Sequence, residues 1–350
     1  MKKKWAALAA GMLGLLIAAT LLIYFDLKEF ARSAGGAGEA EHHLIVPPGQ
    51  SLAATAEALL SHQLIRSAFK FRMLARLEGY DRRLKAGEYS LSSSMSPRAI
   101  LERMAKGLVR LHRLTVPEGF TIMQIADQVG KAELAPAVDI VQRAKDPAYA
   151  RSQGIDAPSL EGYLFPETYF FPRTVTPDGI IAAMLQAFRS AFPPEWERRA
   201  AELGFTVHET VTLASIIEKE TGDPSERPLI SSVFHNRLKR GMRLETDPTV
   251  IYGIPNFDGN LTRKHLETPT PFNTYIVRGL PPGPIASPGR DALKAALYPA
   301  QTDYIFFVSK NNGTHHFSTN LADHNRAVQL YQVGSGSPRQ RPPHDDVKAP

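Results

Sequence analysis

The chain has 350 residues, which is enough for two or three domains that each bury a hydrophobic core. It contains no cysteine, which excludes a disulfide framework and a cysteine-ligated metal site. Its formal net charge of +6 is modest for this length and is spread along the sequence, so no nucleic-acid partner is indicated.

Residues 1–25 have the pattern of a cytoplasmic stub and a membrane anchor. Lys2–Lys4 precede an uncharged apolar run, residues 5–24, that is long enough to cross a bilayer as a helix. Lysines before the run and none directly after it predict a cytoplasmic N-terminus, with the remaining chain outside the inner membrane. A cleaved signal peptide is the alternative, but no small-residue cleavage site ends the run at Tyr24, which favours a single-pass anchor.

A flexible linker is expected at residues 26–43, because 33–38 are mainly glycine, alanine and serine. Residues 44–113 then predict a strand, a helix over 51–60, a helix over 67–77 and a strand over 84–91, followed by a helix over 96–107. This βααβ order resembles a LysM domain, a small module that binds amino-sugar polymers. A generic α+β spacer without sugar binding fits the pattern equally well.

The turn of the first module recurs later in the chain. Val46-Pro47-Pro48-Gly49 is echoed by Val116-Pro117-Glu118-Gly119, and similarly spaced apolar residues follow each turn. We therefore expect a second LysM-like subunit at about 114–165 that closes with a strand at Glu161–Leu164. It opens a mixed α+β domain spanning 114–332, and the Ser-, Pro- and charge-rich residues 333–350 are expected to be a disordered tail. The fold class is α+β.

The stretch Leu213–Thr221 predicts a buried helix that carries carboxyl groups. At about 100° per residue its apolar side chains cover a broad arc that includes Glu218 and, between Leu213 and Ile216, Glu220. The opposite, polar side is formed by Thr212, Ser215 and Lys219. Apolar surroundings raise the pKa of a carboxyl group, and general-acid catalysis requires an acid still protonated near neutral pH. The alternative is a surface helix with a solvated Glu220 and a Glu218 that pairs with an arginine.

Turn signals divide the rest of the domain. Gly222 is expected in the left-handed conformation at the end of the helix, and Asp223-Pro224 to start the next one. Asp247 precedes a proline and is expected to be extended. His315 and His316 are adjacent on a predicted strand and point to opposite faces, so they do not favour a shared metal.

Six motifs together resemble the YceG-like family, the endolytic murein transglycosylases. In chain order they are Leu160–Tyr169, Leu213–Thr221, Phe234–Leu238, Thr246–Val250, Asn273–Tyr275 and Gly279–Ile285. The resemblance extends from the anchor to about Tyr331. Its departures are Glu245, where glutamine is usual, and residues 270–272, where Ser-Pro-Tyr is usual. It implies an inner-membrane protein with a periplasmic catalytic domain that cleaves nascent peptidoglycan strands internally, beside peptidoglycan synthases (penicillin-binding proteins).

The resemblance also implies that Glu218 is the catalytic residue. No metal or cofactor is expected. Protonated Glu218 would donate to the glycosidic oxygen between N-acetylmuramic acid and N-acetylglucosamine, and would then accept the proton of the muramoyl C6 hydroxyl as it closes onto C1. The candidates for substrate binding, each with a structural alternative, are Glu220, Asn236, Asp247, Tyr252, Asn273 and Tyr275.

Two other function classes stay open from the residues. A hydrolase of the same bond would use water, with Asp247 as the base, and would leave a reducing end. A non-catalytic anchor would bind glycan and recruit wall synthases. The carboxyl-bearing buried helix argues against the anchor, because a scaffold does not need it.

Overall fold

The computed structural model describes residues 2–333, so most of the predicted tail lies outside the described residues. The mixed α+β class is confirmed: helices predominate, and within the described part the strands form two-stranded sheets. The chain divides into two compact units. The first contains the residues up to Leu114 with Ala132–Leu134 and Tyr169–Thr176, and the second contains the remainder.

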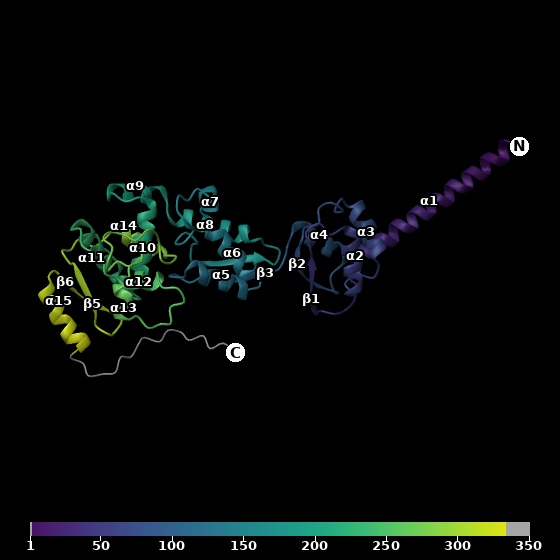
Figure 1. The fold of residues 1–350 in the computed structure, drawn as a ribbon. Coiled ribbons are helices and arrows are strands. Elements are labelled where there is room, and N and C mark those ends of the chain that lie inside the picture. Colours follow the sequence, from purple (N-terminus) through teal and green to yellow (C-terminus); the bar gives the residue numbers. More distant parts are fainter. Residues whose placement is uncertain (1, 334–350) are drawn as a thin grey trace. The chain divides into compact units, whose positions relative to one another are not determined.

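The first unit begins with helix α1, Lys2–Arg32 (Figure 1). Its apolar side chains from Ala10 to Phe25 are exposed, and it is the one helix within residues 2–333 long and apolar enough to cross a membrane. This suits a membrane anchor or a signal sequence. The last turns differ, because Leu27, Phe30 and Ala31 are buried in the core of the module that follows.

The linker prediction is therefore wrong over its first part, since residues 26–32 are helical. The glycine-rich segment that follows is also held against the module. Gly36 donates its backbone N–H to the Ser93 carbonyl (2.8 Å), and Arg66 Nε donates to the Gly35 carbonyl (3.1 Å). A Cβ at Gly35 would lie 2.5 Å from the Leu64 carbonyl oxygen, so only glycine allows this close approach.

The module itself has the predicted βααβ order. Strand β1 (Glu41–Val46) pairs antiparallel with β2 (Gly87–Ser92), with Leu44 opposite Tyr89, and helices α2 (Leu52–Ser61) and α3 (Ala68–Leu77) lie between them in sequence. Helix α4 follows at Pro97–Lys106. The serines predicted to begin these helices cap them: Ser51, Ser67 and Ser96 each accept a backbone N–H.

The second repeat is longer than predicted. Strand β3 (Leu111–Thr115) is followed by helices α5 (Ile122–Lys131), α6 (Ala137–Ala144) and α7 (Pro147–Ser152), and it pairs with β4 (Thr168–Pro172). Glu161–Leu164 is not the closing strand, because the backbone turns there and Gly162 takes a φ of +85°. The echoed turn is nevertheless real, since Gly49 and Gly119 both have positive φ, +80° and +75°.

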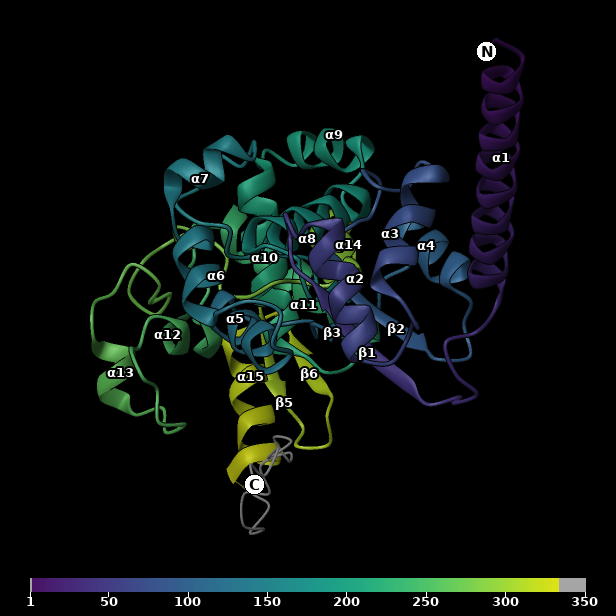
Figure 2. The same cartoon turned by 90° about the vertical axis from the view of Figure 1, so that its right-hand side faces the viewer.

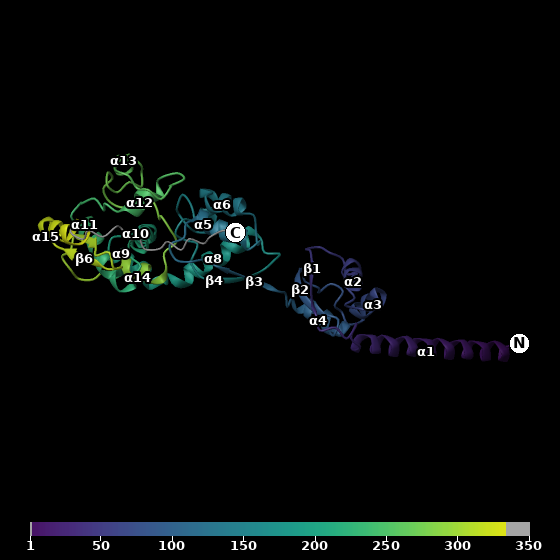
Figure 3. The ribbon, with the colours of Figure 1, turned by 90° about the horizontal axis from the view of Figure 1, so that it is seen from below.

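In the second unit, helix α10 (Val207–Glu220) is the central element (Figure 2). It contacts α9 (Pro194–Glu202), α11 (Arg227–Lys239), α12 (Asp247–Tyr252) and α14 (Arg290–Leu297). Helix α8 (Pro177–Ala191) packs on α6. Strands β5 (Phe306–Ser309) and β6 (His315–Ser318) form an antiparallel hairpin beside α15 (Leu321–Val328) (Figure 3). The remaining elements are the short helix α13 (Arg263–Glu267), the 3₁₀ turn η1 (Pro224–Glu226) and the π-helical turn η2 (Gln329–Val333).

Two local predictions in this unit are wrong. Helix α10 ends at Glu220, and Thr221 after it is extended. Gly222 does not take positive φ, and Asp223 caps η1 directly afterwards. Asp247 is the first residue of α12 and not part of an extended segment: Pro248 lies in its first turn, where proline is favoured.

Candidate active site

Helix α10 is buried on every side in its middle. Thr206 and Glu209 form a capping box at its start, and every residue from Thr210 to Ile217 is buried. The predicted polar side is thus wrong for Thr212 and Ser215, which are buried, whereas Lys219 is exposed. Thr212 donates to the His208 carbonyl (2.7 Å), and the Ser215 hydroxyl donates to the Thr212 carbonyl while accepting the backbone N–H of Ile285. Helix propensity and tertiary packing together fix the position of the two glutamates at its end.

Glu218 lies in a charged cluster. Its side chain is 6% exposed and accepts a hydrogen bond from Arg227 Nη2 (2.8 Å). An arginine partner for Glu218 was the alternative interpretation of the sequence. Its other oxygen accepts the backbone N–H of Gly289 (2.9 Å) at the start of α14, and Glu118 of the echoed turn also pairs with Arg227 (3.3 Å). Burial raises the pKa of Glu218, whereas the Gly289 N–H and Arg227 counteract it by stabilising the carboxylate.

Glu220 has a different environment, one helical half-turn away. Among the described residues its carboxyl group accepts one hydrogen bond, from the Thr246 hydroxyl, and forms no ion pair. Burial raises its pKa to about 7, and the nearby charge of Asp247 adds to this effect. Glu220 is therefore about half protonated near pH 7.

Glu220 also lines a cavity of about 530 Å³, a volume typical of small-ligand sites, which are about 300–1,000 Å³. Glu218 does not line this cavity. The polar side chains that share the wall with Glu220 include Arg237, Glu245, Asp247, Tyr275 and His315, and Phe306 and Phe307 supply aromatic surface. A carboxylic acid, hydrogen-bonding groups and aromatic surface at one wall are suited to a carbohydrate.

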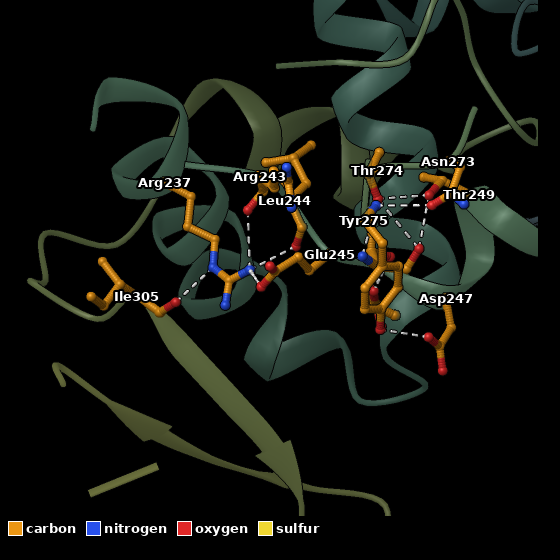
Figure 4. A network of polar contacts seen from close by, with 12 residues as sticks. Arg237, Arg243, Leu244, Glu245, Asp247, Thr249, Asn273, Thr274, Tyr275 and Ile305 are labelled. Atoms are coloured by element: carbon orange, nitrogen blue, oxygen red, sulfur yellow. Dashed lines mark hydrogen bonds and ion pairs between the residues drawn. The ribbon is translucent and has the colours of Figure 1, made fainter. Parts of the chain in front are cut away.

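The network at the cavity wall is shown in Figure 4. Tyr275 donates its hydroxyl proton to Asp247 Oδ1 (2.7 Å), and this contact raises the pKa of the phenol beyond the effect of burial. Arg237 is buried and donates to the carbonyls of Ile305 (2.7 Å) and Leu244 (2.9 Å) as well as to Glu245 Oε2 (3.1 Å). These bonds anchor the loop before α12, where Glu245 takes a φ of +50°.

The side chains of three expected substrate-binding residues form hydrogen bonds to other groups of the protein. Asn273 is fully buried, and its amide donates to the carbonyls of His265, Leu266 and Thr268. The Asn236 amide donates to the carbonyls of Thr302 and Tyr304. These two side chains hold loops, which leaves them no donor for a ligand.

Tyr252 is the third. Its hydroxyl donates to Glu161 Oε2 (3.1 Å), and its ring packs edge-to-face on Phe272, with centroids 4.8 Å apart. The other oxygen of Glu161 accepts the backbone N–H of Ile122 at the start of α5 (3.0 Å), and burial raises the pKa of Glu161 to about 7. Tyr252 therefore ties α12 to α5. Of the six expected substrate-binding residues, the structure brings Glu220, Asp247 and Tyr275 together at the cavity.

The comparisons with known proteins agree with the motifs. A model of the YceG-like family matches residues 44–330. The chain belongs to the YceG-like family. It is 34% identical to a Bacillus subtilis protein named endolytic murein transglycosylase, over 82% of this chain and 83% of that one. It is also 30% identical to a Streptococcus pneumoniae protein of the same name, over 81% of this chain and 57% of the longer relative.

The fold of this YceG-like protein is similar to a crystal structure of a YceG-like protein from Listeria monocytogenes. The TM-score is 0.57 at 33% sequence identity, and the match covers 83% of this chain and 99% of the Listeria chain. Most of this chain therefore shares its fold with a solved structure.

Several site residues of this YceG-like protein were not singled out from the sequence. Glu118 entered only as part of the repeated turn and Arg237 only within the motif Phe234–Leu238, and Glu226 was not named. The signal that could have found Arg237 is an arginine on the buried side of a helix, which requires partners for its donors. Within residues 2–333, no group of three or more His, Cys, Asp or Glu side chains is arranged to hold a metal.

Proposed function

We propose that this YceG-like protein is an endolytic peptidoglycan lytic transglycosylase. It cleaves the β-1,4 bond between N-acetylmuramic acid and N-acetylglucosamine within nascent strands and leaves 1,6-anhydro ends, which terminates strand elongation. Family membership and the names of its relatives support the reaction. The single structural observation that supports it is a carboxyl group with a pKa of about 7 at the wall of a polar, aromatic-lined cavity.

That carboxyl group is Glu220, and we propose it as the general acid in place of the expected Glu218. A general acid must be protonated and must reach the leaving oxygen. Glu220 lines the cavity and forms no ion pair among the described residues, and the charge of Arg237 at the same wall only partly offsets the rise in its pKa that burial causes. Glu218 instead accepts hydrogen bonds from Arg227 and the Gly289 N–H, and these two contacts oppose the rise in its pKa that burial causes. Glu218 would then fix the junction of α10, α11 and α14.

The reaction consumes no water and needs no cofactor. Glu220 donates its proton to the glycosidic oxygen as the C1–O bond breaks, and N-acetylglucosamine leaves with a hydroxyl group. The muramoyl C6 oxygen bonds to C1 and loses its proton, so the product carries a 1,6-anhydro ring and charge is conserved. Asp247 and Tyr275 are positioned to hydrogen-bond sugar hydroxyl groups at the same wall.

Digestion of uncrosslinked glycan strands by the full-length protein in detergent tests the assignment. Glu220→Gln keeps an acceptor for Thr246 but cannot donate an acidic proton, so anhydro-end release should fall at least about 10²–10⁴-fold. Glu218→Gln is the matched variant on the same helix. We expect its activity to decrease only to the extent that its melting temperature decreases. If folded Glu218→Gln is inactive while folded Glu220→Gln is active, the acid is Glu218.

A hydrolase is the second candidate, because Asp247 lies at the same cavity and could activate a water. Mass spectrometry of the released ends distinguishes the two, since an anhydro end is lighter by one water than a reducing end. If the protein were a non-catalytic scaffold, the Glu220→Gln variant would retain full cellular function.

We also propose that α1 anchors the protein in the inner membrane through residues 5–24, with the remaining chain in the periplasm near peptidoglycan synthases. The support is the length and apolar composition of α1. Because the chain has no cysteine, single-cysteine variants at the N-terminus and in α9 can be labelled from outside intact spheroplasts. Labelling of the N-terminal cysteine alone would contradict this orientation.

A further inference from the structure

Helix α3 of the first unit carries an apolar stripe on its outer side. Its inner side enters the core of the module through Ala68, Phe71, Leu74 and Ala75. On the outer side Phe69, Met73 and Leu77 follow one another at four-residue spacing, so they form a single stripe along the helix. Phe69 is 65% exposed and Leu77 is 69% exposed, with the partly buried Met73 between them. Apolar residues that are exposed together mark an interaction surface, whereas scattered single ones do not.

Basic side chains border this stripe. At about 100° per residue, Arg72 and Arg76 lie along one flank of it, and both are at least partly exposed. The segment 66–83, which contains α3, has six basic and two acidic residues, and one of the acidic residues, Glu78, already pairs with Arg98. Phenylalanine and leucine along one stripe, with arginine or lysine beside them, are typical of helices that lie in the interface of an anionic membrane.

The position of α3 relative to α1 is set by contacts within the first unit. Lys70, on the other flank of the stripe, pairs with Asp26 of α1 (2.7 Å), and its ammonium group lies 6.0 Å from the centroid of the Phe30 ring. Leu27 and Phe30 of α1 are buried in the same core as Phe71 of α3. Figures 1 and 3 show α3 beside the end of α1. The module is therefore joined to α1 by packing and not only by the chain.

The edge of the module on α1 coincides with the end of the apolar run. Tyr24 and Leu27 lie on the same face of α1, one turn apart, yet Tyr24 is 55% exposed whereas Leu27 is buried. The edge of the module thus falls between these two residues, a rise of about 4.5 Å along the helix. The apolar run 5–24 ends at the same place, and Asp26 is the first charged residue after it. If α1 spans the bilayer, this edge lies at the membrane surface, and α3, which contacts Asp26, belongs to it.

We propose that the outer side of α3 docks on the periplasmic surface of the bilayer that α1 crosses. Phe69 and Leu77 would enter the interface, and Arg72 and Arg76 would contact the phosphates of anionic phospholipids. The inference rests on the proposed anchoring by α1 and adds a second, peripheral contact of the module with the same membrane. A lipid surface is the partner because the stripe lies where the span ends and its flank has the charge opposite to that of anionic headgroups. Since a single span lets the module tilt, this second contact fixes which side of the module faces away from the membrane.

A fluorescent reporter at one chosen position tests the contact, because the chain has no cysteine of its own. Full-length protein with Leu77→Cys, labelled with the environment-sensitive dye NBD, is reconstituted in vesicles of phosphatidylglycerol and phosphatidylcholine. Part of the phosphatidylcholine carries a nitroxide near its headgroup, which quenches dyes at that depth. Ile45→Cys is the matched control, since Ile45 is also apolar and 55% exposed but lies opposite Glu88 in the β1–β2 sheet and not on α3.

We expect the nitroxide lipid to quench the dye of Leu77→Cys strongly and the dye of Ile45→Cys little. Vesicles of phosphatidylcholine alone should quench less, because the arginines find no anionic headgroup there. Adding Arg72→Glu and Arg76→Glu changes the charge of the flank by about four units and should lower the docking equilibrium constant at least about 10-fold, which removes most of the quenching. Both replacements keep a good helix former on an outer face, so the melting temperature should not change.

Equal quenching of the Leu77→Cys and Ile45→Cys dyes would overturn the proposal. Quenching that survives Arg72→Glu with Arg76→Glu would also overturn it, since docking would then not depend on the arginines. A dye at Leu77→Cys whose emission shifts to the blue without quenching by nitroxide lipid would mean that protein, such as a second copy of this chain, covers the stripe. That result would overturn the proposal as well.

Failure of the proposed anchoring gives a different result. Flotation of the vesicles after extraction with alkaline carbonate, which strips peripheral proteins, tests whether α1 spans the bilayer. Protein that does not float would overturn the anchor and, with it, the docking of α3. Protein that floats while the dye of Leu77→Cys stays unquenched would overturn the docking of α3 alone.

Discussion

The sharpest consequence of the raised pKa of Glu220 is an effect on stability. An unfolded glutamate has a pKa of about 4.5, whereas folded Glu220 has a pKa of about 7. Between these values the folded state holds a proton that the unfolded state has released, so the free energy of unfolding decreases as pH rises. The decrease is absent below pH 4.5 and complete above pH 7. Glu220→Gln removes this dependence, so its stability relative to the wild type should increase over this range.

The magnitude follows from the shift. A difference of about 2.5 pKa units at about 1.36 kcal/mol per unit gives an upper bound of about 3 kcal/mol. Because Glu220 is only half-buried at the cavity wall, solvent screens part of the effect, and we expect about 1–2 kcal/mol. Glu161 has a similar pKa but is present in both proteins, so it cancels from the comparison.

Urea unfolding at pH 4.5 and pH 8 measures this difference. The chain has two tryptophans, and replacing Trp5 by phenylalanine leaves Trp196 in α9 as a reporter of the second unit. Glu218→Gln is the contrasting variant. It removes the main partner of buried Arg227 and should cost about 2 kcal/mol or more at both pH values. If the stability of Glu220→Gln relative to the wild type does not rise between the two pH values, burial does not hold Glu220 protonated.

Four further substitutions test the site and the contacts that support it. Gly162→Ala should destabilise by about 3 kcal/mol or more in urea unfolding, because the new Cβ would lie 2.5 Å from Pro284 at a positive φ. Gly154→Ala, also at positive φ but with open space around it, should cost only about 1 kcal/mol. Tyr275→Phe should lower the melting temperature little and reduce turnover of glycan strands, since the hydrogen bond to Asp247 is lost at the cavity wall; unchanged KM and kcat would exclude a role in the site. Asn273→Ala should cost about 2–4 kcal/mol, because it leaves three loop carbonyls without their donor, and a loss of activity without a loss of stability would contradict its structural role.

Local signals predicted the elements whose causes are local. The serine caps of α2, α3 and α4 depend on residues three positions apart, and Pro97 and Gly107 mark the two ends of α4. The apolar helix that begins the chain was evident from composition alone. Where a local prediction was wrong, packing against a neighbouring element determined the structure instead. Residues 26–32 continue α1 because Leu27, Phe30 and Ala31 find a core to enter.

The sequence by itself determined the family, the repeated turn and the existence of a helix that ends in two glutamates, because these are properties of neighbouring residues. It did not determine the chemistry of those glutamates. The charge state of a carboxyl group depends on what the rest of the chain places around it. Arg227 and Gly289 reach Glu218, and Thr246 reaches Glu220. Only the tertiary structure brings these distant residues together, and with them it decides which acid can keep its proton.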